Sequence, residues 1–99
     1  MRIIARKTLK EFWTQPRYRD AREPLKSWFA IARSAQWSTP MQVKEQFRQT
    51  SFIGNNRCVF NIAGNKYRLI VKFNYPLQIG FIRFIGTHNE YDRIDAESI

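Results

Sequence analysis

Hydrophobic and polar residues alternate in the last third of the chain, and this alternation predicts three strands: Arg57–Ile62, Tyr67–Phe73 and Ile79–Gly86. Successive side chains of a strand point to opposite faces, so the apolar positions collect on one face of a sheet. Gly64-Asn65, between the first two strands, predicts a tight hairpin. The first two of these strands are therefore expected to be antiparallel neighbours.

The alternation also assigns side chains to the two faces of the sheet. The apolar face is predicted to contain Cys58, Phe60, Ile62, Tyr67, Leu69, Val71, Phe73, Ile82 and Phe84. The opposite face is mixed and is predicted to contain Arg57, Val59, Asn61, Arg68, Ile70, Lys72, Phe81, Arg83 and Ile85. Charged groups resist leaving water, so cations on all three strands indicate a face that stays open. We expect helices on the apolar face and an anionic ligand on the other.

The first half of the chain shows helical spacing after a short apolar segment. Arg2–Ala5 predicts a first strand, and Lys7–Thr14 predicts a helix. A second helix is expected to begin between Asp20 and Pro24, where Asp20 has capping-box spacing to Glu23. Its apolar stripe consists of Leu25, Trp28, Phe29, Ala32 and Ala35.

Thr39-Pro40 predicts the start of a third helical segment, because threonine is a good N-cap and proline suits the first helical position. This segment covers Met41–Phe47 and is followed by a predicted loop at 52–56. The chain has 99 residues and no linker, so we expect one domain, 1–99. The predicted class is α+β, with the N-terminal strand and helices on one face of the sheet.

Charge adds a prediction about partners. The chain has 17 Lys plus Arg against 8 Asp plus Glu, a net charge of +9. Such an excess favours an anionic partner, nucleic acid first and an acidic protein second, although a charged surface can also serve solubility alone. One histidine and one cysteine argue against a zinc cage, and we expect no cofactor. No apolar run has the length of a membrane helix or signal peptide, so we expect a cytoplasmic protein.

Three segments of the sheet region carry a resemblance to a known family. They are Arg57-Cys58-Val59-Phe60-Asn61-Ile62, 64–70 (Gly-Asn-Lys-Tyr-Arg-Leu-Ile) and 81–92, which ends in Gly86-Thr87-His88-Asn89-Glu90-Tyr91-Asp92. Together with 20–25 and Trp28, they resemble the HigB family of bacterial toxins, within the RelE-like mRNA interferases. The resemblance implies a RelE-like fold, with helices on one side of a mostly antiparallel sheet, and cleavage of mRNA in the ribosomal A site. It also implies a HigA-type helix-turn-helix antitoxin, through which any contact with operator DNA would be made.

RNA cleavage through the 2′-hydroxyl needs a base, a cation for the phosphate oxygens and an acid for the leaving oxygen. Arg68 and Arg83 are the predicted cations, because guanidinium stays charged and can hold two phosphate oxygens. His88 is the predicted acid or base, because histidine titrates closest to neutral pH. Tyr91 could stack on a base or touch phosphate, or it could anchor the C-terminal segment in the core. These four are the candidate catalytic residues.

A second set is predicted to hold RNA without taking part in the reaction: Arg57, Asn61, Asn65, Lys66 and Lys72. The basic N-terminal residues are candidates for contact with ribosomal RNA: Arg6, Lys7, Lys10, Arg17, Arg19 and Arg22.

The sequence departs from RelE itself, which is known for lysines on the strand that here carries Val59 and Asn61. The general base therefore stays open between His88 and Lys66. Two other functions also stay open: a non-catalytic RNA- or DNA-binding module, and an inactive family member that binds only its antitoxin.

Overall fold

The computed structural model describes residues 1–99. Its elements, in chain order, are β1 (Arg2–Ile4), α1 (Arg6–Trp13), the 3-10 helix η1 (Pro16–Ala21), α2 (Arg22–Ser34), α3 (Pro40–Gln46), β2 (Ser51–Ile53), β3 (Arg57–Ile62), β4 (Tyr67–Asn74), β5 (Ile79–Thr87) and α4 (His88–Tyr91). The three predicted C-terminal strands are confirmed to within one residue at each end.

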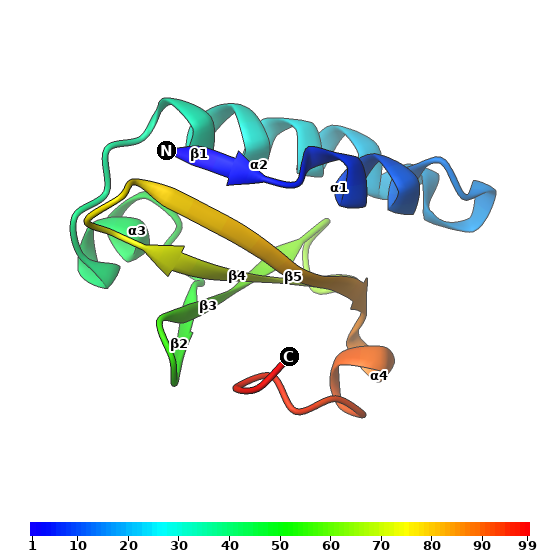
Figure 1. Cartoon of the computed structure of the whole chain (residues 1–99). Coiled ribbons are helices and arrows are strands. Elements are labelled where there is room, and N and C mark those ends of the chain that lie inside the picture. The colour runs from blue at the N-terminus through cyan, green and yellow to red at the C-terminus, as the bar shows by residue number, and fades with distance from the viewer.

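One five-stranded sheet organises the fold, in the order β1-β5-β4-β3-β2. β1 runs parallel to β5, and every other neighbouring pair is antiparallel. Helices α1 and α2 lie along one face of the sheet, whereas α4 and the C-terminal segment lie on the other side (Figure 1). This arrangement confirms the predicted α+β class and its mostly antiparallel sheet.

The apolar face of β3 and β4 has the predicted register. Cys58 lies opposite Val71, Phe60 opposite Leu69, and Ile62 opposite Tyr67. These side chains are buried against the apolar sides of α1 and α2, and the core residues from the helices include Leu9, Phe12, Trp13, Leu25, Trp28 and Ala32. Trp28 crosses Phe60 edge to face, with ring centroids 5.3 Å apart. The alternation therefore predicted the core side of the sheet correctly.

A bulge in β5 corrects the predicted faces of two residues. Ile70 pairs with Phe84 but the next residue, Val71, pairs with Ile82, so Arg83 is an extra residue on β5. An extra residue reverses the alternation beyond it. Phe84 therefore lies opposite Ile70 on the outer face, and Ile85 packs against the helical core. The sequence prediction was wrong for both, because it assumed an unbroken strand.

Two local predictions for the chain before β3 were also wrong, the first of them in part. Phe52 and Ile53 of the predicted loop belong to strand β2, because they pair with β3, whereas residues 54–56 form a turn. Asp20 does not cap α2, because η1 precedes this helix and Ala21 stands at its N-cap. The predicted cap of α3 is confirmed, since the Thr39 side chain accepts a hydrogen bond from the Gln42 amide.

The outer face of the sheet is less open than the sequence predicted. The C-terminal segment 93–99 passes beneath the sheet in Figure 1, and the Ile99 carbonyl accepts hydrogen bonds from Arg57 and Arg83. Val59 and Ile70 are 3% and 0% exposed on this face. Their apolar strip explains the cover, because leaving it in water would forfeit hydrophobic stabilisation. None of the helices is both long and apolar enough to cross a bilayer.

Candidate active site

The start of β4 and the end of β5 meet at the edge of the outer face that lies nearest α4. Arg68 pairs with Gly86 and Tyr67 with Thr87, and the His88 amide donates to the Lys66 carbonyl at 3.3 Å. The strand pairing therefore places the only histidine two residues beyond the position opposite Arg68. We refer to Arg68, His88, Tyr91 and their immediate partners as the strand-end site.

A capping box fixes the turn that carries His88. The Thr87 hydroxyl accepts a hydrogen bond from the Glu90 amide at 3.1 Å, and the Glu90 carboxylate accepts one from the Thr87 amide at 2.8 Å. The two bonds satisfy amides that a helix start leaves unpaired. They hold α4 directly against the end of β5, so His88 has a defined position although its side chain is exposed.

The imidazole of His88 has a carboxylate partner within its own turn. Nδ1 lies 3.1 Å from Oδ2 of Asp92, so the ring lies in direct contact with a carboxylate. This contact orients the ring and leaves Nε2 as the nitrogen available to a ligand. Tyr91 lies one helical turn after His88 and is half-buried. The turn thus presents an imidazole and a phenol on neighbouring positions.

Arg68 is held at the edge of the hairpin that joins β3 and β4. Its Nη1 donates to the carbonyls of Asn65 at 3.1 Å and Tyr67 at 3.3 Å. Asn61, which pairs with Arg68 across the strands, donates to the Asn65 side chain at 3.3 Å. These contacts restrain the guanidinium but use only Nη1, so its other N–H groups remain available for a phosphate.

Gly86 allows the Phe84 ring and the Glu90 carboxylate to approach the backbone of β5 closely at this edge. A Cβ at this position would lie 2.6 Å from Cζ of Phe84 and 3.0 Å from the Glu90 carboxylate. The Phe84 ring therefore lies against the glycine on the outer face, next to Arg68 on the neighbouring strand. The bulge at Arg83 places Phe84 and Gly86, which share a face because they are two residues apart, on the outer side of the sheet.

Lys66 forms an ion pair that ties the hairpin to η1. Its Nζ lies 2.6 Å from Oδ2 of Asp20, and the Tyr67 hydroxyl donates to the other carboxylate oxygen. The hydrogen bond from Lys66, and then that from Tyr67, lower the pKa of Asp20. Burial, followed by the bond to Asp20, raises the pKa of Tyr67 to about 12. The Lys66 ammonium is therefore engaged, whereas Nε2 of His88 has no partner in the chain.

The remaining predicted residues lie away from the strand-end site. Arg83 occupies the bulge and donates through Nε to the Ile99 carbonyl at 3.2 Å. Arg57 is 5% exposed and donates to the same carbonyl through Nε at 3.1 Å. Lys72 pairs with Arg57 across the strands and is exposed. The structure thus brings Arg68, His88, Tyr91, Asn61, Asn65 and Lys66 to one end of the sheet. It places Arg57 and Lys72 toward the other end and Arg83 in the middle of β5.

Sequence reasoning missed several residues that shape the site. Asp92, to which the sequence analysis gave no role, contacts the imidazole of His88. Thr87 and Glu90 form the capping box, and their Thr-x-x-Glu spacing was a readable signal for it. Asp20 had no such signal, because its partners lie 46 and 47 residues away.

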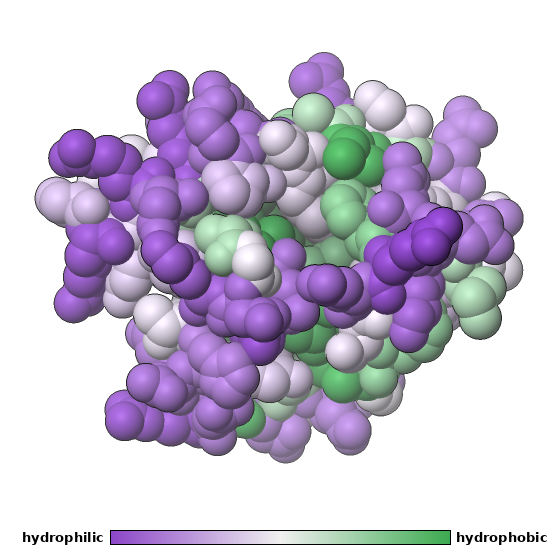
Figure 2. All heavy atoms as spheres, turned by 180° about the vertical axis from the view of Figure 1, so that it is seen from behind, coloured by the Kyte–Doolittle hydropathy of each residue, from purple (hydrophilic) through white to green (hydrophobic).

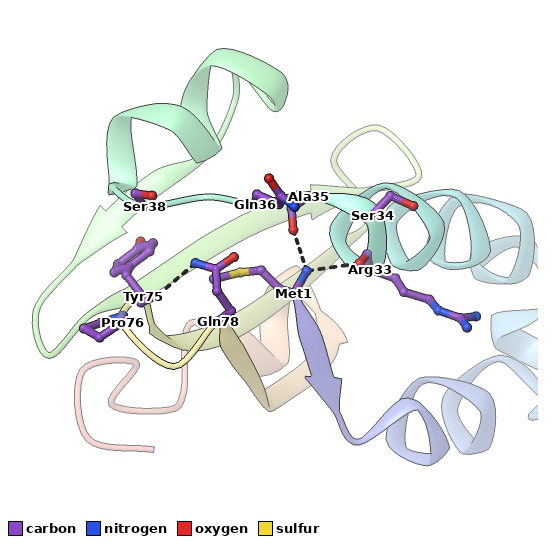
Figure 3. A pocket seen from close by; sticks show the side chains of 9 residues that line it. All are labelled: Met1, Arg33, Ser34, Ala35, Gln36, Ser38, Tyr75, Pro76 and Gln78. Atoms are coloured by element: carbon purple, nitrogen blue, oxygen red, sulfur yellow. Dashed lines mark hydrogen bonds between the residues drawn. The ribbon is translucent and has the colours of Figure 1, made fainter.

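The other surface cavities do not combine an arginine with a histidine. One, of about 730 Å³, lies beside the start of β1, where Met1, Gln36, Tyr75 and Gln78 line it (Figure 3). The Met1 amine there donates to carbonyls at the end of α2, at 3.2 Å for Ala32 and 3.0 Å for Arg33. Its burial lowers the pKa of this amine. Nowhere do three histidine, cysteine or carboxylate side chains gather as a metal-binding group.

Fold and site together define a small α+β protein with a cationic site at one end of a mostly antiparallel sheet. The model of the HigB toxin family, described as the RelE-like toxic component of a toxin-antitoxin system, matches residues 21–94. The chain belongs to this family, as the sequence resemblance implied. Members of the family therefore have an antitoxin as partner. No curated protein matches the chain.

Proposed function

We propose that this toxin is an endoribonuclease that cleaves mRNA through the 2′-hydroxyl next to the scissile phosphate. The 2′ oxygen forms a bond to phosphorus and the bond from phosphorus to the 5′ oxygen breaks. The products are a 2′,3′-cyclic phosphate and a 5′-hydroxyl. This chemistry needs no group beyond those of the chain and the RNA, so the proposed reaction is metal-independent.

The observation that carries the proposal is the juxtaposition of Arg68 and His88. The pairing of Arg68 with Gly86 and the hydrogen bond from the His88 amide to Lys66 bring a guanidinium and an imidazole to one strand end. In the proposed mechanism Arg68 binds the non-bridging phosphate oxygens and Nε2 of His88 accepts the 2′-hydroxyl proton. The Tyr91 hydroxyl or water protonates the leaving 5′ oxygen.

We further propose that Asn61, Asn65 and Lys66 bind the RNA around the scissile phosphate, and that Lys72 binds phosphates farther along the strand. Lys66 would do so while paired with Asp20, as a positioned cation rather than as the base. Arg57 is assigned no part in the chemistry, because it is 5% exposed and hydrogen-bonded to Ile99. Arg83 is assigned none because it lies opposite Ile70 and Val71, away from His88. Their predicted roles stay predictions.

The proposed setting is the ribosomal A site in the cytoplasm, with a HigA-type helix-turn-helix antitoxin that also makes any contact with operator DNA. The N-terminal cations support contact with ribosomal RNA, since all six are exposed: Arg6, Lys7, Lys10, Arg17, Arg19 and Arg22. Phosphate contacts of this kind are electrostatic and weaken as salt increases.

The test is to map the 5′ ends of cellular mRNA after brief expression of the toxin. We expect new 5′-hydroxyl ends inside translated codons, and a loss of cutting of at least about a hundredfold for His88→Ala, which removes the proton-transferring group. Lys26→Ala, which removes an exposed cation on α2, is the matched control and should cut normally. Growth arrest with intact message would instead indicate a non-catalytic binding module. A folded protein that binds antitoxin without arresting growth would indicate an inactive member.

A further inference from the structure

A cavity of about 640 Å³ lies at the end of the sheet opposite to the strand-end site, where β4 turns into β5. The residues that line it include Asn56, Lys72, Asn74, Tyr75, Phe81 and Arg83. We refer to this cavity as the β4–β5 cleft. Its volume lies within the range of about 300–1,000 Å³ that is typical of sites for small ligands.

A lysine and a phenylalanine stand side by side in the cleft. Lys72 pairs with Phe81 on one side and with Arg57 on the other, so the three residues form one cross-strand row. Arg57 donates to the Ile99 carbonyl beneath the sheet, so this row lies on the outer face. Directly paired side chains have Cβ atoms about 5 Å apart, which places an ammonium group next to an aromatic ring.

Neither of these two side chains is used by the rest of the chain. Lys72 is exposed and forms no ion pair. Phe81 is half-buried, and its ring takes part in none of the aromatic contacts within the chain. The backbone pairing of β5 fixes the base of the ring, whereas the face of the ring remains available to a ligand.

Two side-chain amides add hydrogen-bonding groups to the cleft. The Asn74 side-chain oxygen accepts from the Leu77 amide at 3.1 Å, which leaves its two N–H groups for a ligand. Asn56 is exposed, and its backbone carbonyl accepts from the Phe73 amide at 2.8 Å, which holds this residue against β4. Side-chain amides can bind the edges of unpaired bases.

The charge of the cleft indicates an anionic ligand that also has an aromatic part. The lining residues include two cations, Lys72 and Arg83, and no carboxylate. Hydrophobic areas also interrupt the mostly hydrophilic surface seen from behind (Figure 2), but a merely apolar area offers no cation for a phosphate. A nucleotide uses all three kinds of group, since its base stacks on a ring and its phosphate binds a cation. An acidic peptide would use the cations alone.

Strand β4 relates the cleft to the strand-end site. Lys72 follows Arg68 by four residues on β4, which is roughly 13 Å at a rise of about 3.3 Å per residue. A nucleotide in the cleft is therefore separate from the scissile phosphate, which the proposed function places at Arg68.

We propose that the β4–β5 cleft is a second nucleotide-binding site, which holds one base of single-stranded RNA away from the scissile phosphate. The base stacks on Phe81, its edge hydrogen-bonds to Asn56 and Asn74, and Lys72 binds the adjoining phosphate. Arg83 adds positive charge at the rim. That this RNA is the message being cut rests on the proposed function, whereas the binding of a base rests on the cleft alone.

The test uses the intact toxin and a short single-stranded oligoribonucleotide that is 2′-O-methylated throughout, so that it cannot be cleaved. An abasic strand of the same length and charge is the control. We expect the strand with bases to bind at least about tenfold more tightly and to shift the Phe81 ring signals in NMR spectra, because stacking needs a base.

Two outcomes of these measurements would contradict the proposal. Equal affinity for the two strands would show that phosphate charge alone accounts for binding. A polyglutamate peptide of equal charge that shifts the Phe81 signals as strongly would indicate an acidic protein as the partner of the cleft instead.

Variants then locate the binding of the base. Phe81→Ala should weaken binding of the strand with bases by about tenfold and leave binding of the abasic strand unchanged, whereas Phe81→Tyr keeps the ring and should bind normally. Lys72→Ala should weaken both strands alike, because it removes a phosphate contact. Phe52→Ala is the matched control and should bind as the unaltered protein does. Phe52 is 43% exposed, with its ring 5.5 Å from the Lys44 ammonium, but it lies outside the cleft.

The cleft and the proposed function fail in different ways. No loss in Phe81→Ala, or an equal loss in Phe52→Ala, would overturn the second site while leaving cleavage at the strand-end site untouched. A toxin that binds bases through Phe81 but leaves cellular message uncut would keep the second site and refute the proposed nuclease.

Discussion

The two ends of the outer sheet face carry similar cations in different surroundings. At the strand-end site, Arg68 uses Nη1 for backbone carbonyls and lies near an exposed imidazole. At the other end, Arg57 is 5% exposed and donates to the carbonyl of Ile99, in the C-terminal segment that passes beneath the sheet (Figure 1). Arg83, in the middle of β5, also donates to this carbonyl but is exposed. Burial therefore keeps Arg57 from meeting a ligand, whereas its position in the strand separates Arg83 from His88.

The largest effect that can test this difference is on RNA cleavage. Arg68→Ala should lower the cleavage rate by about a hundredfold or more, because it removes charge stabilisation at the phosphate. Arg83→Ala should lower the rate by no more than about threefold, since Arg83 lies opposite Ile70 and Val71, away from His88. Cleavage rates on a defined message with purified ribosomes measure both. An equal loss in the two variants would show that the middle of β5 also takes part.

Glycine substitutions provide a second comparison, this time of the free energy of unfolding at the two ends of the sheet. Gly86→Ala should destabilise the fold by about 1–3 kcal/mol, because its Cβ would overlap Phe84 and the Glu90 carboxylate that caps α4. Gly54→Ala should change stability by about 0.5 kcal/mol or less, since its Cβ would meet only the exposed Glu97 side chain at 3.3 Å. Urea unfolding measures both free energies. A Gly86→Ala protein as stable as the parent would contradict the tight contact described.

The smallest effect concerns the ion pair that supports the strand-end site. Asp20 has a lowered pKa in the folded state, so its carboxylate stabilises the fold above the unfolded pKa of about 4. This contribution is lost as the pH falls through the folded pKa. Asp20→Asn should therefore reduce the free energy of unfolding at pH 7, with a difference from the parent that shrinks on acidification. Urea unfolding along a pH series measures this difference.

Glu11→Gln is the matched control for this prediction. Glu11 also forms an exposed ion pair, at 3.6 Å from Lys7, but this pair lies within one helix and has no third partner. Exposed pairs of this type contribute little, so the variant should have nearly the same stability as the parent. A pH-independent deficit in Asp20→Asn would show that the lost contacts are not those of the carboxylate charge.

Much of the sheet could be predicted because its information is local. The alternation through Cys58, Phe60 and Ile62 specified both the strand and the side that faces the helices, and β4 shows the matching pattern. The same reasoning failed at Phe84, because a single extra residue at Arg83 has no signature in the hydrophobic pattern. Periodicity predicts a regular strand, whereas a bulge depends on how the neighbouring strand must pair.

The candidate site, too, could be predicted from the sequence only in part. His88 and Arg68 could be proposed from residue type and position, and Thr87 with Glu90 could have been read as a capping box. That these residues would lie together, and that Arg83 would not join them, required the register of β4 against β5. Chemical type is a property of the residue, but proximity is a property of strand pairing.

By itself the sequence determined the three C-terminal strands, the helix-facing side of β3 and β4, the cationic character and the family resemblance, because each depends on composition or short-range spacing. Only the tertiary structure decided which cations are covered, how Asp20 joins Lys66 and Tyr67, and that Lys72 lies beside Phe81. Those features arise where segments distant in the chain meet. Their energies depend on contact geometry, which no local pattern encodes.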